Sequence, residues 1–195
     1  MKSVSWTLGL LLVVGWMLSP VAWAQPKSAP PFLKPLMDQL MAIDTVPTPQ
    51  ELRAIDPQVE DRLVDAAREP ALNEYARARA VTLLSLFPTP ETYARLLTLQ
   101  TEPDEEIAAM AVYVAARTFG PEAPDMVLET TIAALYSPSK TIRKKAILAT
   151  RWIGRPDDVR QHLHVYLERE VDPELIRLVG RTLRKVNAVG QGQSQ

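Results

Sequence analysis

One pattern recurs along this sequence of 195 residues and limits the folds that it can adopt. Four segments each begin with a small or polar residue of the kind that caps a helix, and continue for about four helical turns. They are NEYARARAVTLLSLF from Asn73, DEEIAAMAVYVAARTF from Asp104, SKTIRKKAILATRWIG from Ser139 and DPELIRLVGRTLRKV from Asp172. Counted between residues 80, 111, 146 and 179, which occupy the same place in the four segments, the spacings are 31, 35 and 33. A period in the thirties is typical of folds built by stacking pairs of helices.

Each segment carries one stripe of apolar and small residues. The stripe recurs at offsets of 0, 4, 8 and 11, which lie on one side of an α-helix. Its rows are Ala76, Ile107, Ile142 and Leu175; Ala80, Ala111, Ala146 and Val179; Leu84, Ala115, Thr150 and Leu183; and Phe87, Thr118, Ile153 and Val186. No segment alternates with period two, and hairpin dipeptides such as Asn-Gly are absent. The pattern predicts an all-α fold.

The gaps between these segments have room for a partner helix in each repeat. We expect the partners at about residues 57–68, 89–100, 123–136 and 156–168. Thr89 followed by Pro90 is a start signal, with Thr as N-cap and Pro at the first helical position. Other prolines fall at the expected boundaries, at positions 121, 124, 138, 156 and 173. The chain is therefore predicted to form about four to five antiparallel helix pairs, an α-solenoid over residues 47–187.

The capped segments resemble the second helix of HEAT-like, armadillo-type repeats. That pattern is a cap, a spacer, an aliphatic residue, an Arg, two residues, a small residue, then an aliphatic residue and often a Gly. The segment from Ser139 is the best match, at Ile142, Arg143, Ala146, Ile153 and Gly154. Segments from Asp104 and Asp172 depart from it, with Ala108 and Ile176 in place of the Arg. The resemblance covers residues 57–187 and implies a right-handed solenoid whose first helices face the convex side and whose second helices face the concave side.

The N-terminal residues resemble a secretory signal peptide. Lys2 precedes an apolar run, a Ser19-Pro20 break and the sequence AWA, which ends at Ala24. We expect cleavage after Ala24 and a periplasmic or secreted protein without a transmembrane anchor; an uncleaved anchor over residues 3–24 is the alternative. Residues 25–46 are predicted to hold a Pro-rich linker and a short helix whose apolar face is Phe32, Leu36, Leu40 and Ile43. Residues 188–195 are predicted to be a disordered tail.

No residue pattern predicts a catalytic, cofactor or metal site. The chain has no cysteine, which excludes thiolate ligands, disulfides and cysteine nucleophiles. His162 and His164 are two positions apart and cannot bind one ion from one helix face, so we expect one half-packed and one solvated ring. Asp157 and Asp158 follow a proline and fit the first turn of a helix. Phosphate-binding loops and nucleophile elbows are also missing. We expect a protein that is not an enzyme.

Charge is distributed unevenly between the two sets of helices. The four capped segments sum to +6, and the partner segments 57–70, 89–102, 121–138 and 155–171 sum to −7, in a chain of formal net charge −1. Lys140, Lys144 and Arg151 lie opposite the apolar stripe of their helix, at about 100° per residue. The sequence thus predicts a basic surface made of Lys140, Arg143, Lys144, Arg151, Arg181, Arg184 and Lys185. A solvated face without a partner is the competing interpretation.

Three functions are compatible with these features. The first is an exported interaction module that binds an acidic envelope or secreted protein in its concave face; an anionic glycan or a lipid headgroup is an alternative ligand. Nucleic acid is disfavoured by the net charge and by the expected compartment. The second is an enzyme accessory, like the lyase-associated HEAT-like proteins that handle bilin chromophores. The third is a structural spacer in an envelope assembly.

Overall fold

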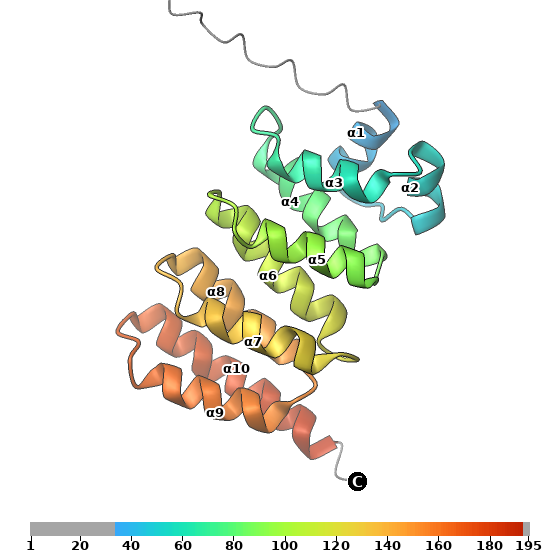
Figure 1. Ribbon diagram of the computed structural model, residues 1–195. Helices are drawn as coiled ribbons and strands as arrows, with labels where there is room; N and C mark the ends of the chain where they lie inside the picture. The colour runs from blue at the N-terminus through green and yellow to red at the C-terminus, as the bar shows by residue number, and fades with distance from the viewer. Residues whose placement is uncertain (1–33, 193–195) are drawn as a thin grey trace, which may run out of the picture. The chain divides into compact units, whose positions relative to one another are not determined.

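The computed structural model describes residues 34–192, with side chains for residues 34–187. Within these residues the chain forms ten α-helices and two 3₁₀ turns, and no β-strand (Figure 1). The predicted all-α fold class is therefore confirmed. The predicted signal peptide and Phe32 lie outside the described residues. None of the helices within residues 34–192 has the length and apolarity needed to cross a bilayer.

The predicted helix pairs are present with bounds close to those expected. The first helices of the pairs are α3 (Val59–Arg68), α5 (Pro90–Leu99), α7 (Pro124–Leu135) and α9 (Pro156–Leu167). The second helices are α4 (Glu74–Leu83), α6 (Glu105–Phe119), α8 (Lys140–Ala149) and α10 (Pro173–Gly192). Two of them tighten into 3₁₀ turns at their ends, η1 (Leu84–Leu86) after α4 and η2 (Thr150–Trp152) after α8.

Side-chain caps begin all four second helices where the sequence predicts. The Asn73 side chain accepts a hydrogen bond from the backbone N–H of Ala76, and Ser139 accepts one from Ile142. Asp104 and Asp172 each accept two backbone N–H groups of their own first turns. These oxygens satisfy donors that have no partner inside the helix. Proline occupies the first turn of α5, α7 and α9, where its missing N–H costs nothing.

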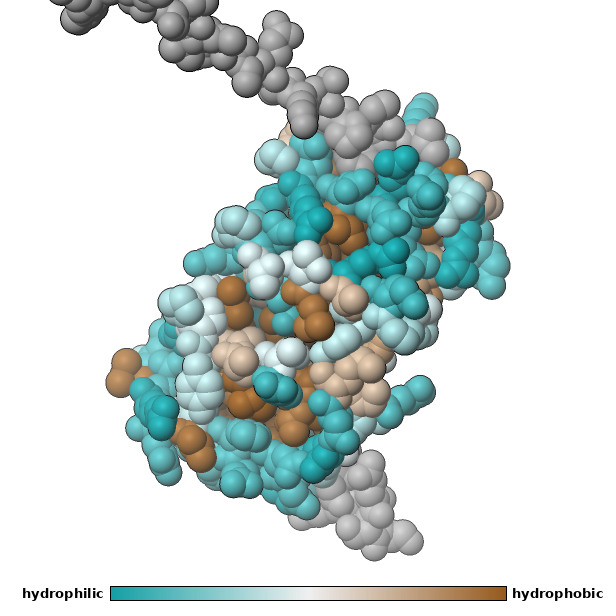
Figure 2. Space-filling view, in the orientation of Figure 1, coloured by the Kyte–Doolittle hydropathy of each residue, from teal (hydrophilic) through white to brown (hydrophobic). Residues whose placement is uncertain are grey.

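The second helices pack on one another in order and form one layer. α6 contacts α4 and α8, α8 contacts α10, and each also packs on the first helix of its own pair. We call α4, α6, α8 and α10 the even layer, and α3, α5, α7 and α9 the odd layer. The odd layer faces the viewer in Figure 1. Figure 2 shows that face, mostly hydrophilic over α2 and α3 with apolar residues gathered over α7 and α9.

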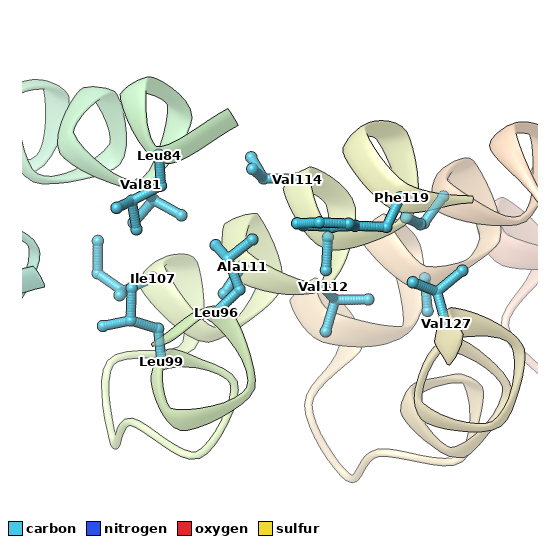
Figure 3. Packing of buried hydrophobic residues seen from close by; sticks show 14 of the residues in the cluster. Val81, Leu84, Leu96, Leu99, Ile107, Ala111, Val112, Val114, Phe119 and Val127 are labelled. Carbon is cyan, nitrogen blue, oxygen red and sulfur yellow. The ribbon is translucent and has the colours of Figure 1, made fainter. Parts of the chain in front are cut away.

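One hydrophobic core runs between the two layers. Of the sixteen predicted stripe residues, all are buried except Ile142, Leu183 and Thr118, which are partly buried. In Figure 3, Val81 of α4 and Leu84 of η1 lie near Ile107 and Ala111 of α6, with Leu96 and Leu99 of α5 beside them. The fully buried alanines at positions 76, 80, 111, 146 and 149 allow close approach of the even helices.

The short helix predicted within residues 25–46 is present and packs on the helix pairs. α1 (Lys34–Met41) packs on α4, buries Leu36 and Leu40, and belongs to the same compact unit as the helix pairs. The Nε of Arg79 donates to the Gln39 carbonyl over 2.8 Å, which fixes α1 to α4. Residues 34–41 therefore form the predicted short helix, which packs into the same domain as the helix pairs. Ile43 is 79% exposed, so its placement on the apolar face is wrong, because α1 ends two residues before it.

The helix α2 and the C-terminal extension of α10 were not predicted. α2 (Pro49–Ile55) follows a capping box, in which Thr48 and Glu51 bond each other's backbone N–H groups. At the other end of the domain, α10 continues to Gly192. The first five residues of the predicted disordered tail are therefore helical.

Candidate binding surface

Ion pairs to the next helix pair neutralise the first basic residues of α8. The Nζ of Lys140 lies 2.8 Å from a carboxylate oxygen of Asp172 and 2.9 Å from one of Glu174. The Nζ of Lys144 lies 2.9 Å from the other oxygen of Glu174. Both lysines are thus held by the acidic first turn of α10. They remain about half exposed, but their charges are balanced within the domain.

Arg143 also joins α8 to the following repeat. Its Nε donates to Glu170 over 3.2 Å, and its Nη1 donates to the carbonyls of Ser137 and Pro138 over 3.0 Å. The Glu170 side chain is only 6% exposed and also accepts the hydroxyl of Tyr166. Burial raises the pKa of Glu170, but these donors outweigh it and lower the pKa below its ordinary value. Arg143 is therefore committed to a structural contact.

An equivalent contact occurs two repeats earlier. Arg77, at the equivalent place in α4, pairs with Asp104, the N-cap of α6. Burial raises the pKa of Asp104, and the hydrogen bonds from Arg77 and from backbone N–H groups more than reverse that effect. The odd layer has parallel links, Arg95 to Asp61 between α5 and α3 and Arg155 to Asp125 between α9 and α7. Several cations that sequence counting treats as surface charge are therefore cross-links between repeats.

Arg151 has a different environment, formed by two aromatic rings. Its Nη2 donates to the hydroxyl oxygen of Tyr113 over 2.8 Å, and its guanidinium carbon lies 5.0 Å from the centroid of the Trp152 ring. The indole Nε1 of Trp152 also donates to Tyr113, over 3.4 Å. The Nε of Arg151 is buried and has no acceptor among the described residues. We call Tyr113 and Trp152 the aromatic pair.

Two more cations meet the aromatic pair, and sequence analysis did not select either. The guanidinium of Arg117 lies 5.9 Å from the Trp152 ring centroid, and the Nζ of Lys145 lies 5.7 Å from the Tyr113 centroid. Such contacts orient a cation over an aromatic face. Burial raises the pKa of the Tyr113 hydroxyl, but hydrogen bonds from Trp152 and Arg151 and the charges of Arg151 and Arg117 give a net lowering. The local field is strongly positive.

The other three predicted cations lie on α10. Arg181, Arg184 and Lys185 are exposed. With Arg117, Lys145 and Arg151 they make six cations on the even layer, which we call the basic ladder. None of the six pairs with a carboxylate within residues 34–187, whereas Lys140, Arg143 and Lys144 all do. The structure thus divides the predicted site into a neutralised part at the start of α8 and a basic ladder.

A glycine contact places η2, and with it Arg151 and Trp152, against the end of α6. The backbone N–H of Gly154 donates to the carbonyl of Gly120 over 2.9 Å. A Cβ on Gly120 would lie 2.7 Å from the carbonyl oxygen of Trp152, closer than a carbon atom tolerates. The lack of a side chain at Gly120 therefore allows α6 and η2 to bring Arg117 and Trp152 together.

Other parts of the surface offer less chemistry. A hollow of about 310 Å³ between α7 and α9 is lined by Leu128, Ile132, Asp125, Glu129 and His162 and is almost wholly apolar. His162 is half-buried and His164 is exposed, as expected from their spacing. Within the described part of the chain, no group of three or more His, Asp or Glu side chains is placed to hold a metal ion.

Comparison with known proteins adds no assignment to this geometry. No protein-family model matches the sequence, and no curated protein is significantly similar to it. Functional inference therefore rests on the basic ladder and on the aromatic pair.

Proposed function

We propose that this protein is an exported interaction module, not an enzyme, and that it binds an acidic envelope or secreted protein through the basic ladder. The supporting observation is the contrast in charge pairing. Six cations on α6, η2, α8 and α10 have no carboxylate partner in residues 34–187, although the same domain pairs its other even-layer lysines and Arg77 with acids. Unpaired charge on one face raises the rate and selectivity of association with a surface of opposite charge.

The proposed architecture is a right-handed HEAT-like α-solenoid with the even layer on its concave side. Direct packing of α6 on α4 and α8, and of α8 on α10, supports this orientation. Contacts between α5 and α7 or between α7 and α9 are sparser. Helices that pack more closely on one side curve a stack toward that side. A concave surface would place the basic ladder where an extended partner can contact several helices at once.

Paired charge variants test this proposal. In the ladder variant, Arg117→Gln, Arg184→Gln and Lys185→Gln remove three unpaired cations. In the control, Lys140→Gln, Lys144→Gln and Arg160→Gln remove three cations that are paired with acids. Tagged full-length chains are expressed in the cells of origin, cross-linked and purified. A partner captured by the native chain and by the control, but lost by the folded ladder variant, supports the proposal. Equal capture by all three contradicts it.

A further inference from the structure

Four of the six cations of the basic ladder occupy nearly equivalent positions on three successive repeats. Taking residues 111, 146 and 179 as equivalent, Arg117 of α6, Trp152 of η2 and Lys185 of α10 occupy the same position, six residues further on. Arg151 and Arg184 occupy the preceding position on their helices. Contact of Arg117 with the Trp152 ring agrees with this alignment. At the equivalent place η1, which follows α4, carries Ser85 and Leu86, so the row of cations begins at α6.

Each of the three repeats contributes one cation site, and helix packing sets the distance between neighbouring sites. Packed helices lie about 8–10 Å apart. A polyproline II segment completes a turn in three residues at ~3.1 Å each, so that its side chains repeat on one face about every 9.3 Å. Side chains on one face of a β-strand repeat every ~6.6–6.8 Å, which is shorter than the distance between packed helices. A strand could therefore not place successive side chains on successive helices. Cations carried on neighbouring packed helices, about 8–10 Å apart, are therefore in step with polyproline II geometry.

The chemistry beside the cations favours the same conformation. Tyr113 and Trp152 lie between α6 and η2, and polyproline II ligands bind to aromatic surfaces. The Tyr113 oxygen accepts hydrogen bonds from Arg151 and Trp152, which leaves its own proton to donate. The side chains around the aromatic pair therefore offer hydrogen-bond donors, and none of them is a carboxylate that could accept. An oxyanion is the group that satisfies them.

We propose that the basic ladder binds a partner segment in the polyproline II conformation that carries Asp or Glu at every third position. This inference rests on the proposed function and specifies its ligand. Each acidic side chain would meet one of three cation sites, which are formed by Arg117, by Arg151 and by the Arg184–Lys185 pair. The intervening residues would contact the aromatic pair. The Pro-rich stretch at residues 25–35 of this chain is not the occupant, because it carries Lys27 and Lys34 and no acid.

Two isomeric peptides provide the test. The first contains four Glu-Pro-Pro triplets; the second contains the same residues with its four glutamates in one block at the N-terminus. Binding to residues 25–195, which include the whole compact unit, is followed by fluorescence anisotropy. Three of the four tryptophans precede residue 25, so tryptophan emission from residues 25–195 reports Trp152 alone. We expect the triplet peptide to shift Trp152 emission and to bind about tenfold more tightly, because two misplaced ion pairs cost about 1.4 kcal/mol.

The charge variants separate the possible outcomes. The inference predicts that the triplet peptide loses binding in the ladder variant and keeps it in the Lys140, Lys144 and Arg160 control. Equal binding of both peptides, lost in the ladder variant, would overturn the polyproline II inference and leave the acidic-partner proposal standing. If neither peptide binds while the partner is still captured through the ladder, the polyproline II inference would likewise be overturned and the acidic-partner proposal would stand. Ladder-dependent binding to phosphatidylglycerol vesicles without peptide binding would overturn both and indicate a lipid surface.

Discussion

Single residues hold the basic ladder in place, and Gly120 is the clearest case. Replacing it with Ala puts a Cβ 2.7 Å from a backbone oxygen of η2, which cannot move without disturbing Trp152. We expect Gly120→Ala to destabilise the fold by about 1–3 kcal/mol, as overpacking does, and to change Trp152 fluorescence.

Gly180 is a matched control for that prediction. It lies inside α10, and a Cβ there would meet nothing within 4 Å. Gly180→Ala should therefore raise stability by about 0.5–1 kcal/mol, because Ala favours the helix. Thermal unfolding of both variants checks the pair, and a stabilising Gly120→Ala would show that η2 does not depend on the close approach.

Arg143 belongs to the basic surface that the sequence predicts, but its contacts indicate a structural role. Removing its guanidinium leaves the nearly buried Glu170 without its cation and the carbonyls of Ser137 and Pro138 without a donor. We expect Arg143→Met to cost about 2 kcal/mol, which lowers the melting temperature by roughly 4–8 °C for a domain of this size.

The Arg143–Glu170 contact can be isolated by a second substitution. Adding Glu170→Gln to Arg143→Met removes the uncompensated carboxylate, so part of the lost stability should return. Additive losses in the double variant would show that the two side chains do not interact. Partner capture should be unchanged in Arg143→Met, because Arg143 is not part of the basic ladder.

The sequence does not reveal which cations pair with a carboxylate on a neighbouring helix. Lys144 and Lys145 are adjacent in the chain, but one meets Glu174 and the other lies over the Tyr113 ring. The difference depends on which neighbouring helix each side chain faces, and that neighbour lies about thirty residues away. A helical wheel ranks side chains by their angle on one helix and contains no information about the next. Arg117 and Lys145 were overlooked for this reason.

At the scale of elements, most of the fold could be predicted. Caps at Asn73, Asp104 and Ser139 and the buried stripe are local signals, and both are confirmed. The short helix α2 was missed although Thr48 and Glu51 have capping-box spacing and Pro49 sits at its first position. Its signal is one turn long and has no repeated partner. The extent of α10 was also underestimated, because glycine and polar residues near the C-terminus weaken helix propensity without forbidding a helix.

Small residues in the stripe are predicted to control how closely α6 and α8 pack. Ala146 is fully buried, at a level where the equivalent residue of α6 is also an alanine, Ala111. We expect Ala146→Leu to lower stability by about 1–3 kcal/mol through overpacking. Ala133→Leu on the exposed face of α7 should be close to neutral. Chemical unfolding measures both, and equal effects would mean that the even layer tolerates added volume.

At the scale of the whole molecule, acid should loosen the links between repeats. Hydrogen bonds from Lys144 and Lys140 lower the pKa of Glu174 to about 2, and the hydrogen bond from Lys140 lowers that of Asp172. Groups whose pKa is lower when folded add stability above their unfolded pKa, and lose it as pH falls through the folded value. We therefore expect the melting temperature to fall as pH decreases from about 4.5 toward about 2.

Removing the lysines tests the origin of that acid sensitivity. Lys140→Gln with Lys144→Gln should melt at a lower temperature at neutral pH and lose less on acidification, so the two melting curves converge at low pH. Circular dichroism between pH 2 and pH 7 measures this. Parallel curves would assign the acid sensitivity to other carboxylates such as Asp104 and Glu170, whose pKa values are also lowered.

The side-chain links between repeats join residues that are no more than about one repeat apart in the sequence. Arg77 reaches Asp104 over 27 positions, Lys144 reaches Glu174 over 30, and Arg151 reaches Tyr113 over 38. Among the described residues no side-chain hydrogen bond spans more than 40 positions. A chain linked in this way can fold repeat by repeat, in the order in which it is synthesised. Each new helix pair can then pack on a preceding pair that has already folded, and only the last pair formed has an exposed apolar face.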